Sequence, residues 1–187
     1  MGLLPPINIP KWLEENGHLL QPPIGNHTVY DGNDFMVMLV GGPNERNDYH
    51  INETEEWFYQ WKGDMLLKVV DGVEFRDIPI QEGSIFLLPP NTPHSPIRFP
   101  NTVGIVIEGA RPKVMKDRLR WYCKNPVHTK PTIIREVVVY VELKSYVEAW
   151  MADESLRKCK ECGTVAPPKH LEKSSRQGDP MRYHSRL

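Results

Sequence analysis

Short apolar runs separated by turn residues dominate the middle of the chain. Turn residues such as Gly41-Gly42-Pro43-Asn44 and Pro89-Pro90-Asn91 recur at intervals of about ten residues, and Asp71-Gly72 between two apolar runs predicts a two-residue hairpin. This spacing is typical of an antiparallel sandwich or barrel, and no helical segments alternate with the runs as a parallel sheet would require. The predicted strands are Phe35–Val40, Trp57–Trp61, Met65–Val70, Val73–Ile80, Ser84–Leu88 and Val103–Ile107.

The two ends of the chain follow different patterns. Asn8 predicts the N-cap of a short helix that Gly17 ends, and residues 20–34 read as a loop because Pro, Gly, Asn and Asp are frequent there. Beyond residue 112 we expect a strand over Val137–Leu143 and a helix over Ser145–Lys158, in which Ser145 and Glu148 form a capping box.

These patterns divide the chain into three parts. We predict a barrel with its N-terminal helix over residues 1–112, a small annex over 113–166, and a polar, basic tail over 167–187 that is disordered. The fold class is therefore mainly β with a small C-terminal annex.

Composition narrows the function. The 187 residues carry 23 Lys and Arg against 24 Asp and Glu, a net charge of −1, which gives no electrostatic basis for binding nucleic acid. No apolar run reaches the roughly 18–20 residues of a membrane span. Three cysteines cannot form a closed disulfide framework, and no signal peptide is recognisable, so we predict a cytoplasmic protein that binds neither nucleic acid nor membrane.

Two histidines and a glutamate stand in segments bracketed by Gly and Pro. His50 and Glu56 are six residues apart, and His94 follows a rigid Pro-Pro-Asn-Thr-Pro turn. Two imidazoles and one carboxylate form a facial triad that leaves positions open on a metal, as non-haem Fe(II) requires. The alternative is that these are unrelated residues, because seven histidines produce such spacings by accident.

The two segments resemble the paired motifs of the cupin superfamily, which implies a jelly-roll barrel with a metal at its centre. Three positions depart from the usual pattern: Asn52 replaces a histidine, Asn91 replaces a glycine whose left-handed conformation Asn tolerates, and Arg98 replaces an asparagine.

Longer stretches resemble one family, 3-hydroxyanthranilate 3,4-dioxygenase. They are residues 41–50, Glu55–Gln60 and Leu88–Pro96, with Val106–Glu108 and Arg120–Cys123 further along, and the likeness covers residues 5–165. It implies that Fe(II), held by His50, Glu56 and His94, binds 3-hydroxyanthranilate and O₂. The ring opens to 2-amino-3-carboxymuconate semialdehyde, a precursor of quinolinate on the route from tryptophan to NAD.

The resemblance also implies substrate-binding residues. Arg98 binds the substrate carboxylate, Glu108 holds the polar ring substituents and accepts a proton, and Arg46 stabilises negative charge developing on oxygen. Glu56 contacts the substrate as well as the metal, and Asn26 and Asp48 match positions near the site. From the residues alone, the favoured interpretation is that Arg98 is a surface cation, Glu108 a rim carboxylate, and Arg46 the partner of Glu45 or Asp48.

The cysteines suggest a second metal site in the annex. Cys159 and Cys162 form half of a rubredoxin-like knuckle. Family members with an annex carry a second such pair, but here Cys123 is followed three residues later by Pro126. His128 is then the candidate fourth ligand. A site of three cysteines and one histidine suits structural Zn²⁺, and iron is the second choice. The alternative is an annex that has lost its metal.

Two other functions stay open. One is a cupin dioxygenase acting on a thiol or an enediol, which would not need both Arg98 and Glu108. The other is a cupin that binds a metal or small ligand without catalysis. By analogy with the family we also expect a homodimer.

Overall fold

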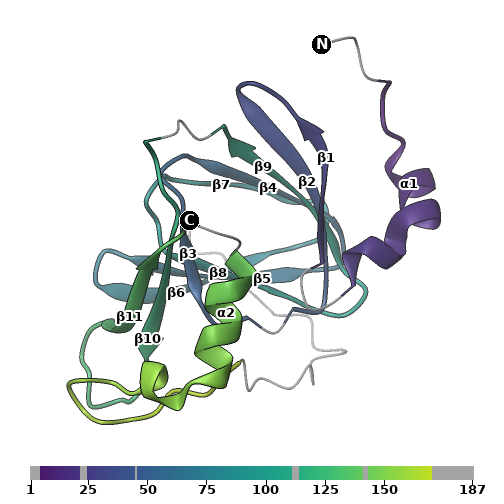
Figure 1. Cartoon of the computed structure of the whole chain (residues 1–187). Helices are drawn as coiled ribbons and strands as arrows, with labels where there is room; N and C mark the ends of the chain where they lie inside the picture. The colour runs from purple at the N-terminus through teal and green to yellow at the C-terminus, as the bar shows by residue number, and fades with distance from the viewer. Residues whose placement is uncertain (1–4, 22–24, 45, 111–113, 141–142, 170–187) are drawn as a thin grey trace, which may run out of the picture.

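Two antiparallel sheets face each other and form a barrel (Figure 1). The computed structural model describes residues 5–21, 25–44, 46–110, 114–140 and 143–169. The five-stranded sheet has the order β1 (Asn26–Asp31), β2 (Phe35–Gly41), β9 (Val103–Gly109), β4 (Glu56–Lys62) and β7 (Ile85–Leu88). The six-stranded sheet has the order β11 (Thr132–Val138), β10 (Arg118–Cys123), β3 (Tyr49–Ile51), β8 (His94–Arg98), β5 (Met65–Asp71) and β6 (Glu74–Ile80).

Alternate residues of the facing strands fill the space between the sheets. On β4 the buried residues are Glu56, Phe58 and Gln60. On β5, in the facing sheet, the buried residues Met65, Leu67 and Val69 also point into the space between the sheets. This period of two is the pattern of a strand with one face toward a core. The apolar side chains gather in the middle of the barrel, and the predicted mainly β architecture is confirmed.

The six predicted strands are confirmed to within one or two residues at their ends. The predicted hairpin joins β5 and β6, which pair from Met65↔Ile80 to Asp71↔Glu74, so that its two turn residues are Gly72 and Val73. Gly72 has a φ of +59°, a left-handed conformation that glycine adopts without steric cost.

The N-terminal helix is confirmed, whereas the loop expected over residues 20–34 is partly wrong. Helix α1 (Ile9–Asn16) begins at Asn8, whose side chain accepts a hydrogen bond of 3.0 Å from the backbone N–H of Lys11. A 3₁₀ turn, η1 (Gly17–Leu20), leads into β1. The turn-rich composition concealed this edge strand, because its exposed positions carry polar residues.

Two predictions in the annex are wrong. Strand β11 ends at Val138, and Leu143, expected to end a strand, instead begins helix α2 (Leu143–Ala152). Ser145 therefore lies inside the first turn and does not cap the helix, and Glu148 pairs with Lys144 one turn away, at 3.7 Å. The chain continues as a 3₁₀ turn, η2 (Glu154–Arg157).

The annex packs against the barrel through aromatic rings and continuous strands. Trp150 of α2 stacks on Trp121 of β10, with ring centroids 4.8 Å apart and planes at 15°. Strand β10 pairs with β3 of the barrel, so the sheet continues across the predicted division at residue 112. The predicted tail begins at Pro167, and beyond Lys169 it lies outside the described residues. Within the described part of the chain, no helix is long and apolar enough to cross a bilayer.

Candidate metal and substrate site

The three predicted metal ligands converge inside the barrel. His50 of β3 and His94 of β8 are direct partners across the two strands, with ring centroids 5.3 Å apart. Glu56, the first residue of β4, reaches both: one carboxylate oxygen lies 3.4 Å from Nδ1 of His50 and the other 3.3 Å from Nε2 of His94. One ligand atom from each residue lies within 4.8 Å of the others, so the three can bind a single cation.

Each imidazole is oriented by a second contact. Nδ1 of His94 lies 3.0 Å from the carbonyl oxygen of Thr92, and Nε2 of His50 lies 2.9 Å from a carboxylate oxygen of Asp117. Such outer contacts fix the ring and raise its basicity as a ligand. The sequence reasoning missed Asp117, because nothing in its local sequence indicates that it meets a residue 67 positions earlier.

The electrostatics of the triad favour a bound cation. Burial alone would raise the pKa of Glu56, but the charges and hydrogen bonds of His94 and His50 outweigh it and hold that pKa well below its usual range. Burial would lower the pKa of His50, yet hydrogen bonds with Asp117 and Glu56 raise it to about 9. Because the same carboxylates that stabilise an imidazolium stabilise a metal cation, the donor set fits a divalent metal. The two carboxylate oxygens of Glu56 are directed one toward each imidazole, which agrees with a ligand role.

The two turns that carry the motifs are joined to each other. Asn91 has a φ of 59°, which confirms that it takes the left-handed conformation of the glycine it replaces. Its backbone N–H donates to the carbonyl of Asn52 at 2.7 Å. The side chain of Asn52 accepts hydrogen bonds from the N–H and hydroxyl of Thr54, so the residue in the place of a histidine shapes the turn before Glu56.

Arg98 is a cation buried inside the barrel. It lies four residues after His94 on β8, on the same face of the strand, and is 3% exposed. Nη1 donates to the side-chain oxygen of Gln60 at 3.3 Å, while Nε is buried without a partner. Burial lowers the pKa of Arg98 to about 10, so it remains charged at neutral pH. A desolvated guanidinium held by a neutral amide is suited to bind an anion that enters the barrel. The reading of Arg98 as a surface cation is excluded.

Two neighbours of Arg98 were not predicted. Gln60 accepts from it, and Gly104 of β9 lets it approach, because a Cβ at Gly104 would lie 2.5 Å from Nη1 of Arg98. An isolated glycine inside a predicted strand is a signal of such a close approach. The position of Gly104 inside a strand could therefore have indicated a close contact, whereas nothing in the sequence indicated the role of Gln60.

Glu108 and the Arg46–Asp48 pair adjoin the triad. Glu108 is 7% exposed and lies opposite Glu56 on the neighbouring strand, so it faces the inside of the barrel and is not a rim carboxylate. Arg46 donates from Nε and Nη2 to the two oxygens of Asp48, at 3.0 and 2.5 Å. Burial opposes a charged Asp48, yet Arg46 lowers the pKa of that carboxyl. The pairing of Arg46 with Asp48 that the residues suggested is present.

Asn26 stands apart from the triad. It begins β1 and is exposed, with Val40 as its partner on β2. Val40 is in turn opposite Gly104, and Gly104 is opposite Gln60. Asn26, on the edge strand β1, is thus the outermost residue of the row Asn26, Val40, Gly104 and Gln60, whose inner end lies beside Arg98. Its role in substrate binding stays a prediction.

The annex brings its four predicted ligands together. The Sγ atoms of Cys123 and Cys162 are 3.7 Å apart, and Nε2 of His128 lies 3.2 Å from Sγ of Cys162 and 3.6 Å from Sγ of Cys159. Nδ1 of the same histidine faces Glu161 at 3.6 Å. All four ligand atoms lie within 4.8 Å of one another, and hydrogen bonds from Thr164 lower the pKa of Cys162 to about 6.

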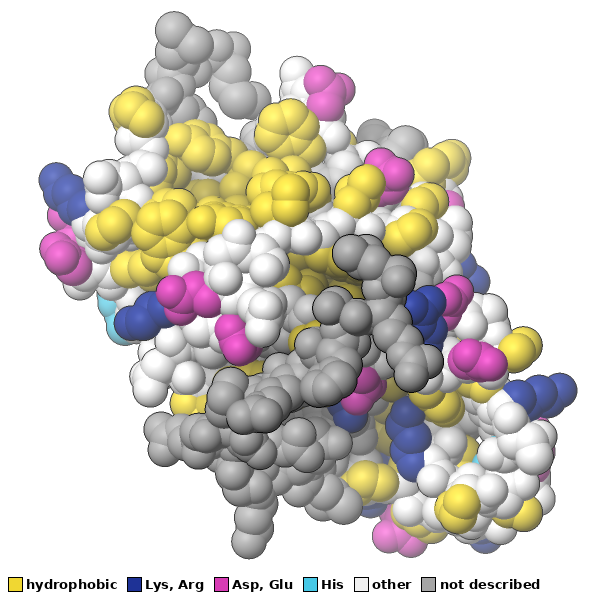
Figure 2. All heavy atoms as spheres, turned by 180° about the vertical axis from the view of Figure 1, so that it is seen from behind, with side chains coloured by type: hydrophobic (Ala, Val, Ile, Leu, Met, Phe, Trp, Pro, Cys, Tyr) yellow, Lys and Arg dark blue, Asp and Glu magenta, His cyan; other side chains and the backbone are white. Residues whose placement is uncertain are grey.

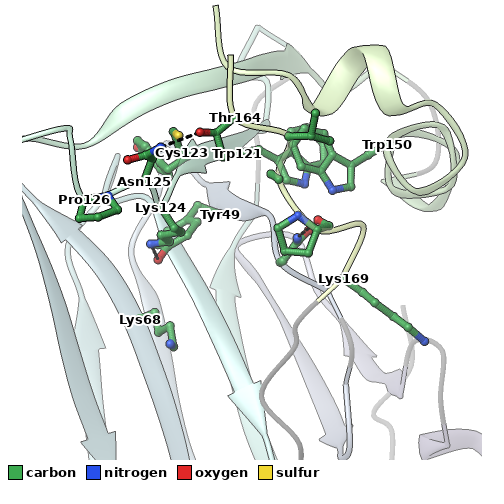
Figure 3. A pocket seen from close by; sticks show the side chains of 15 residues that line it. Tyr49, Lys68, Trp121, Cys123, Lys124, Asn125, Pro126, Trp150, Thr164 and Lys169 are labelled. Carbon is green, nitrogen blue, oxygen red and sulfur yellow. Dashed lines mark hydrogen bonds between the residues drawn. The ribbon is translucent and has the colours of Figure 1, made fainter. Parts of the chain in front are cut away.

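A cavity of about 620 Å³ adjoins this cluster (Figure 3). Lys124, Asn125 and Pro126 line one side, and Trp121, Trp150 and Lys169 line the other, as Figure 3 shows. His50, Glu56 and His94 are not among the residues that line this space.

Comparison with known proteins decides the family. The model of the 3-hydroxyanthranilic acid dioxygenase family matches residues 1–151. The chain belongs to this family. It is 58% identical over 167 residues to the 3-hydroxyanthranilate 3,4-dioxygenase of Pyricularia oryzae, covering 87% of this chain and 90% of the relative. The 3-hydroxyanthranilic acid dioxygenase family assignment confirms the predicted resemblance.

The chain is also similar to a second fungal relative and, in structure, to a cupin-domain protein. The 3-hydroxyanthranilate 3,4-dioxygenase 2 of Aspergillus fumigatus is 51% identical over 188 residues, covering 90% of this chain and all of the relative. A cupin-2 domain containing protein from Shewanella frigidimarina has a similar structure, with a TM-score of 0.44 and 21% identity over 56% of this chain and 94% of its own.

Proposed function

We propose that this member of the 3-hydroxyanthranilic acid dioxygenase family opens the ring of 3-hydroxyanthranilate with O₂, as a non-haem Fe(II) enzyme. The product is 2-amino-3-carboxymuconate semialdehyde, which contains both oxygen atoms. One observation carries this proposal: a buried, charged Arg98 shares a barrel face with His94 and has an unpartnered Nε. That arrangement suits a substrate that binds a metal at one end and presents a carboxylate at the other.

The metal is held by His50, Glu56 and His94. When bound, it supplies the Lewis-acid and redox chemistry that brings substrate and O₂ together. Three protein ligands leave positions open for both reactants on a six-coordinate ion.

The residues around the triad bind and orient the substrate. Arg98 binds the carboxylate through its guanidinium, and Gln60 and Gly104 fix where that guanidinium lies. Glu108 lies opposite Glu56 inside the barrel, where it accepts a proton from the ring hydroxyl or amine. Arg46 places a positive charge beside Glu56 and is held by both oxygens of Asp48, so it supplies a fixed charge for the developing anion.

The decisive assay loads the protein with Fe(II) without oxygen, adds 3-hydroxyanthranilate and then admits air. We expect the near-ultraviolet absorbance of the semialdehyde to appear. A folded, iron-loaded protein that yields none refutes the proposal. His94→Ala should lose both iron and activity, and 2-aminophenol, which keeps the hydroxyl and amine but lacks the carboxylate, should react poorly because Arg98 has nothing to bind.

We also propose that the annex holds a structural Zn²⁺ on Cys123, His128, Cys159 and Cys162. Tetrahedral Zn²⁺ with Zn–S of about 2.3 Å and Zn–N of about 2.0–2.1 Å places two sulfurs roughly 3.8 Å apart and a sulfur and nitrogen about 3.6 Å apart. The distances of 3.7 Å between the sulfurs of Cys123 and Cys162 and 3.6 Å between Cys159 and His128 match these edges, and the distance of 3.2 Å between His128 and Cys162 is shorter than the corresponding edge. Metal analysis should find two ions per chain, and only one in His128→Ala. The cytoplasmic location and the homodimer remain predictions.

A further inference from the structure

The cavity of about 620 Å³ beside the annex lies on the outer face of the six-stranded sheet (Figure 3). Tyr49 of β3 lines it, whereas His50, the next residue on that strand, is a metal ligand inside the barrel. Lys68 of β5 also lines it, whereas its neighbours Leu67 and Val69 fill the barrel core. Because successive side chains of a strand point to opposite faces, the sheet separates this cavity from the metal triad. Its volume is that of a small-molecule pocket.

The charges along this cavity have one sign. Lys68, Lys124 and Lys169 line it, and none of the described residues that line it is Asp or Glu. On the face shown in Figure 2, by contrast, most Lys and Arg side chains lie next to Asp or Glu. The ammonium of Lys124 donates to the hydroxyl of Tyr49 at 3.2 Å and lies 3.4 Å from the centre of the Phe75 ring, so its position is fixed. A concave surface with cations of one sign attracts anions.

Two indole N–H groups on the other side of the cavity lack an acceptor. Trp121 and Trp150 line the cavity and are each 1% exposed, and the Nε1 atom of each is buried with no hydrogen-bond partner among the described residues. The two rings stack, and Figure 3 shows both nitrogens on the same edge of the stack. An indole nitrogen can only donate, so a buried one destabilises the fold until an acceptor reaches it. Two such donors side by side suit the two oxygens of a carboxylate.

We propose that this cavity binds a small aromatic dicarboxylate. One carboxylate accepts from the two indole N–H groups, and the other pairs with Lys68 and Lys124, which lie on the opposite side in Figure 3. The flat ring between the two carboxylates packs against Tyr49 and Pro167, which also line the cavity. A phosphate group at either end would keep oxygen atoms without donors, so two donors on each side suit carboxylates better.

The chain's own residues 170–187 are a poorer occupant. They follow directly on Lys169 at the cavity, but they carry four Lys and Arg against two Asp and Glu. A basic segment is repelled by Lys68 and Lys124 and brings few acceptors to the indole N–H groups.

The test is isothermal titration calorimetry of the full-length protein with isophthalate, a benzene ring with two carboxylates too far apart to chelate one metal ion. Benzoate, which has one carboxylate, should bind at least about tenfold more weakly, because it leaves one side of the cavity unpaired. Trp150→Phe keeps a stacked ring but removes one N–H, and it should weaken isophthalate binding about tenfold. Lys68→Met and Lys124→Met should each do the same, and both should fold because neither lysine is buried. Lys11→Met removes a 72% exposed cation on α1 and is the matched control that should bind like wild type.

The site of binding is checked with Arg98→Met, which removes the anion-binding group inside the barrel and should leave isophthalate binding unchanged. The proposal is overturned if wild type does not bind isophthalate, if the Lys68 and Lys124 variants bind it like wild type, or if Arg98→Met abolishes binding. Binding that appears only after removal of residues 170–187 would also overturn it and assign the cavity to that segment. The ring-opening assay tests the proposed function separately, because the metal triad lies on the other side of the sheet.

Discussion

Replacing Arg98 with methionine should make the protein more stable and less active. Burial lowers the pKa of Arg98 from 12.5 to about 10, and each pKa unit corresponds to about 1.4 kcal/mol, so the buried charge costs folding about 3 kcal/mol below pH 10. The substitution also removes the hydrogen bond to Gln60, which lowers the free energy of unfolding by about 1 kcal/mol. We therefore expect Arg98→Met to raise the free energy of unfolding by about 2 kcal/mol at pH 7.

The same change removes the group that binds the substrate carboxylate. Truncating one partner of a buried ion pair costs about 2–5 kcal/mol, so kcat/KM should fall roughly 30- to 4000-fold, mainly through KM. Urea unfolding and steady-state kinetics measure the two effects, and Arg76→Met, at an exposed ion pair, is the control that should change neither. Two results would refute this reasoning: an Arg98→Met variant that is less stable than wild type, or one whose KM is unchanged. Either would show that the buried charge of Arg98 does not destabilise the fold in order to bind the substrate carboxylate.

Three further changes test other parts of the structure. Gly104→Ala adds a methyl group against the guanidinium of Arg98, and we expect a KM raised about tenfold with unchanged iron content, measured by kinetics and metal analysis. Because Arg46 lowers the folded-state pKa of Asp48, its contribution to stability is present above pH 4 and lost as the pH falls further. Arg46→Met should therefore lose less unfolding free energy than wild type between pH 5 and pH 3 in urea titrations. Cys162→Ser should reduce the metal content from two ions to one per chain and lower Tm while activity at 25 °C persists, and retention of both ions would contradict the annex site.

The sequence predicted the parts of this molecule that depend on local pattern. The strands with apolar alternation and the turn at Gly72 are where that pattern places them, and the Gly- and Pro-bracketed motifs located His50, Glu56 and His94. Local pattern predicted no strand at β1, β3 or β10, and β3 is a strand of only three residues that pairs with β8 and β10.

Contacts between segments that are distant in the sequence could not be predicted from local pattern. The meeting of His50 with Asp117, and of Arg98 with Gln60, depends on how two sheets close on each other. The helix around Ser145 was misplaced because a capping-box pattern occurred by chance two residues inside a helix that begins earlier. Packing of Trp150 on Trp121 fixes that helix more strongly than its local capping signal.

The pairing of β10 with β3 has a consequence for how the chain can be divided. A protein ended at residue 112 would lose β10 and leave β3 as an open sheet edge, with unpaired backbone groups beside the ligand His50. Such an edge is a template for pairing with other chains, so the shortened barrel should aggregate and bind iron poorly. The annex strands therefore cover the edge of the sheet that carries His50. A minimal catalytic fragment has to extend at least through Val138, where β11 ends.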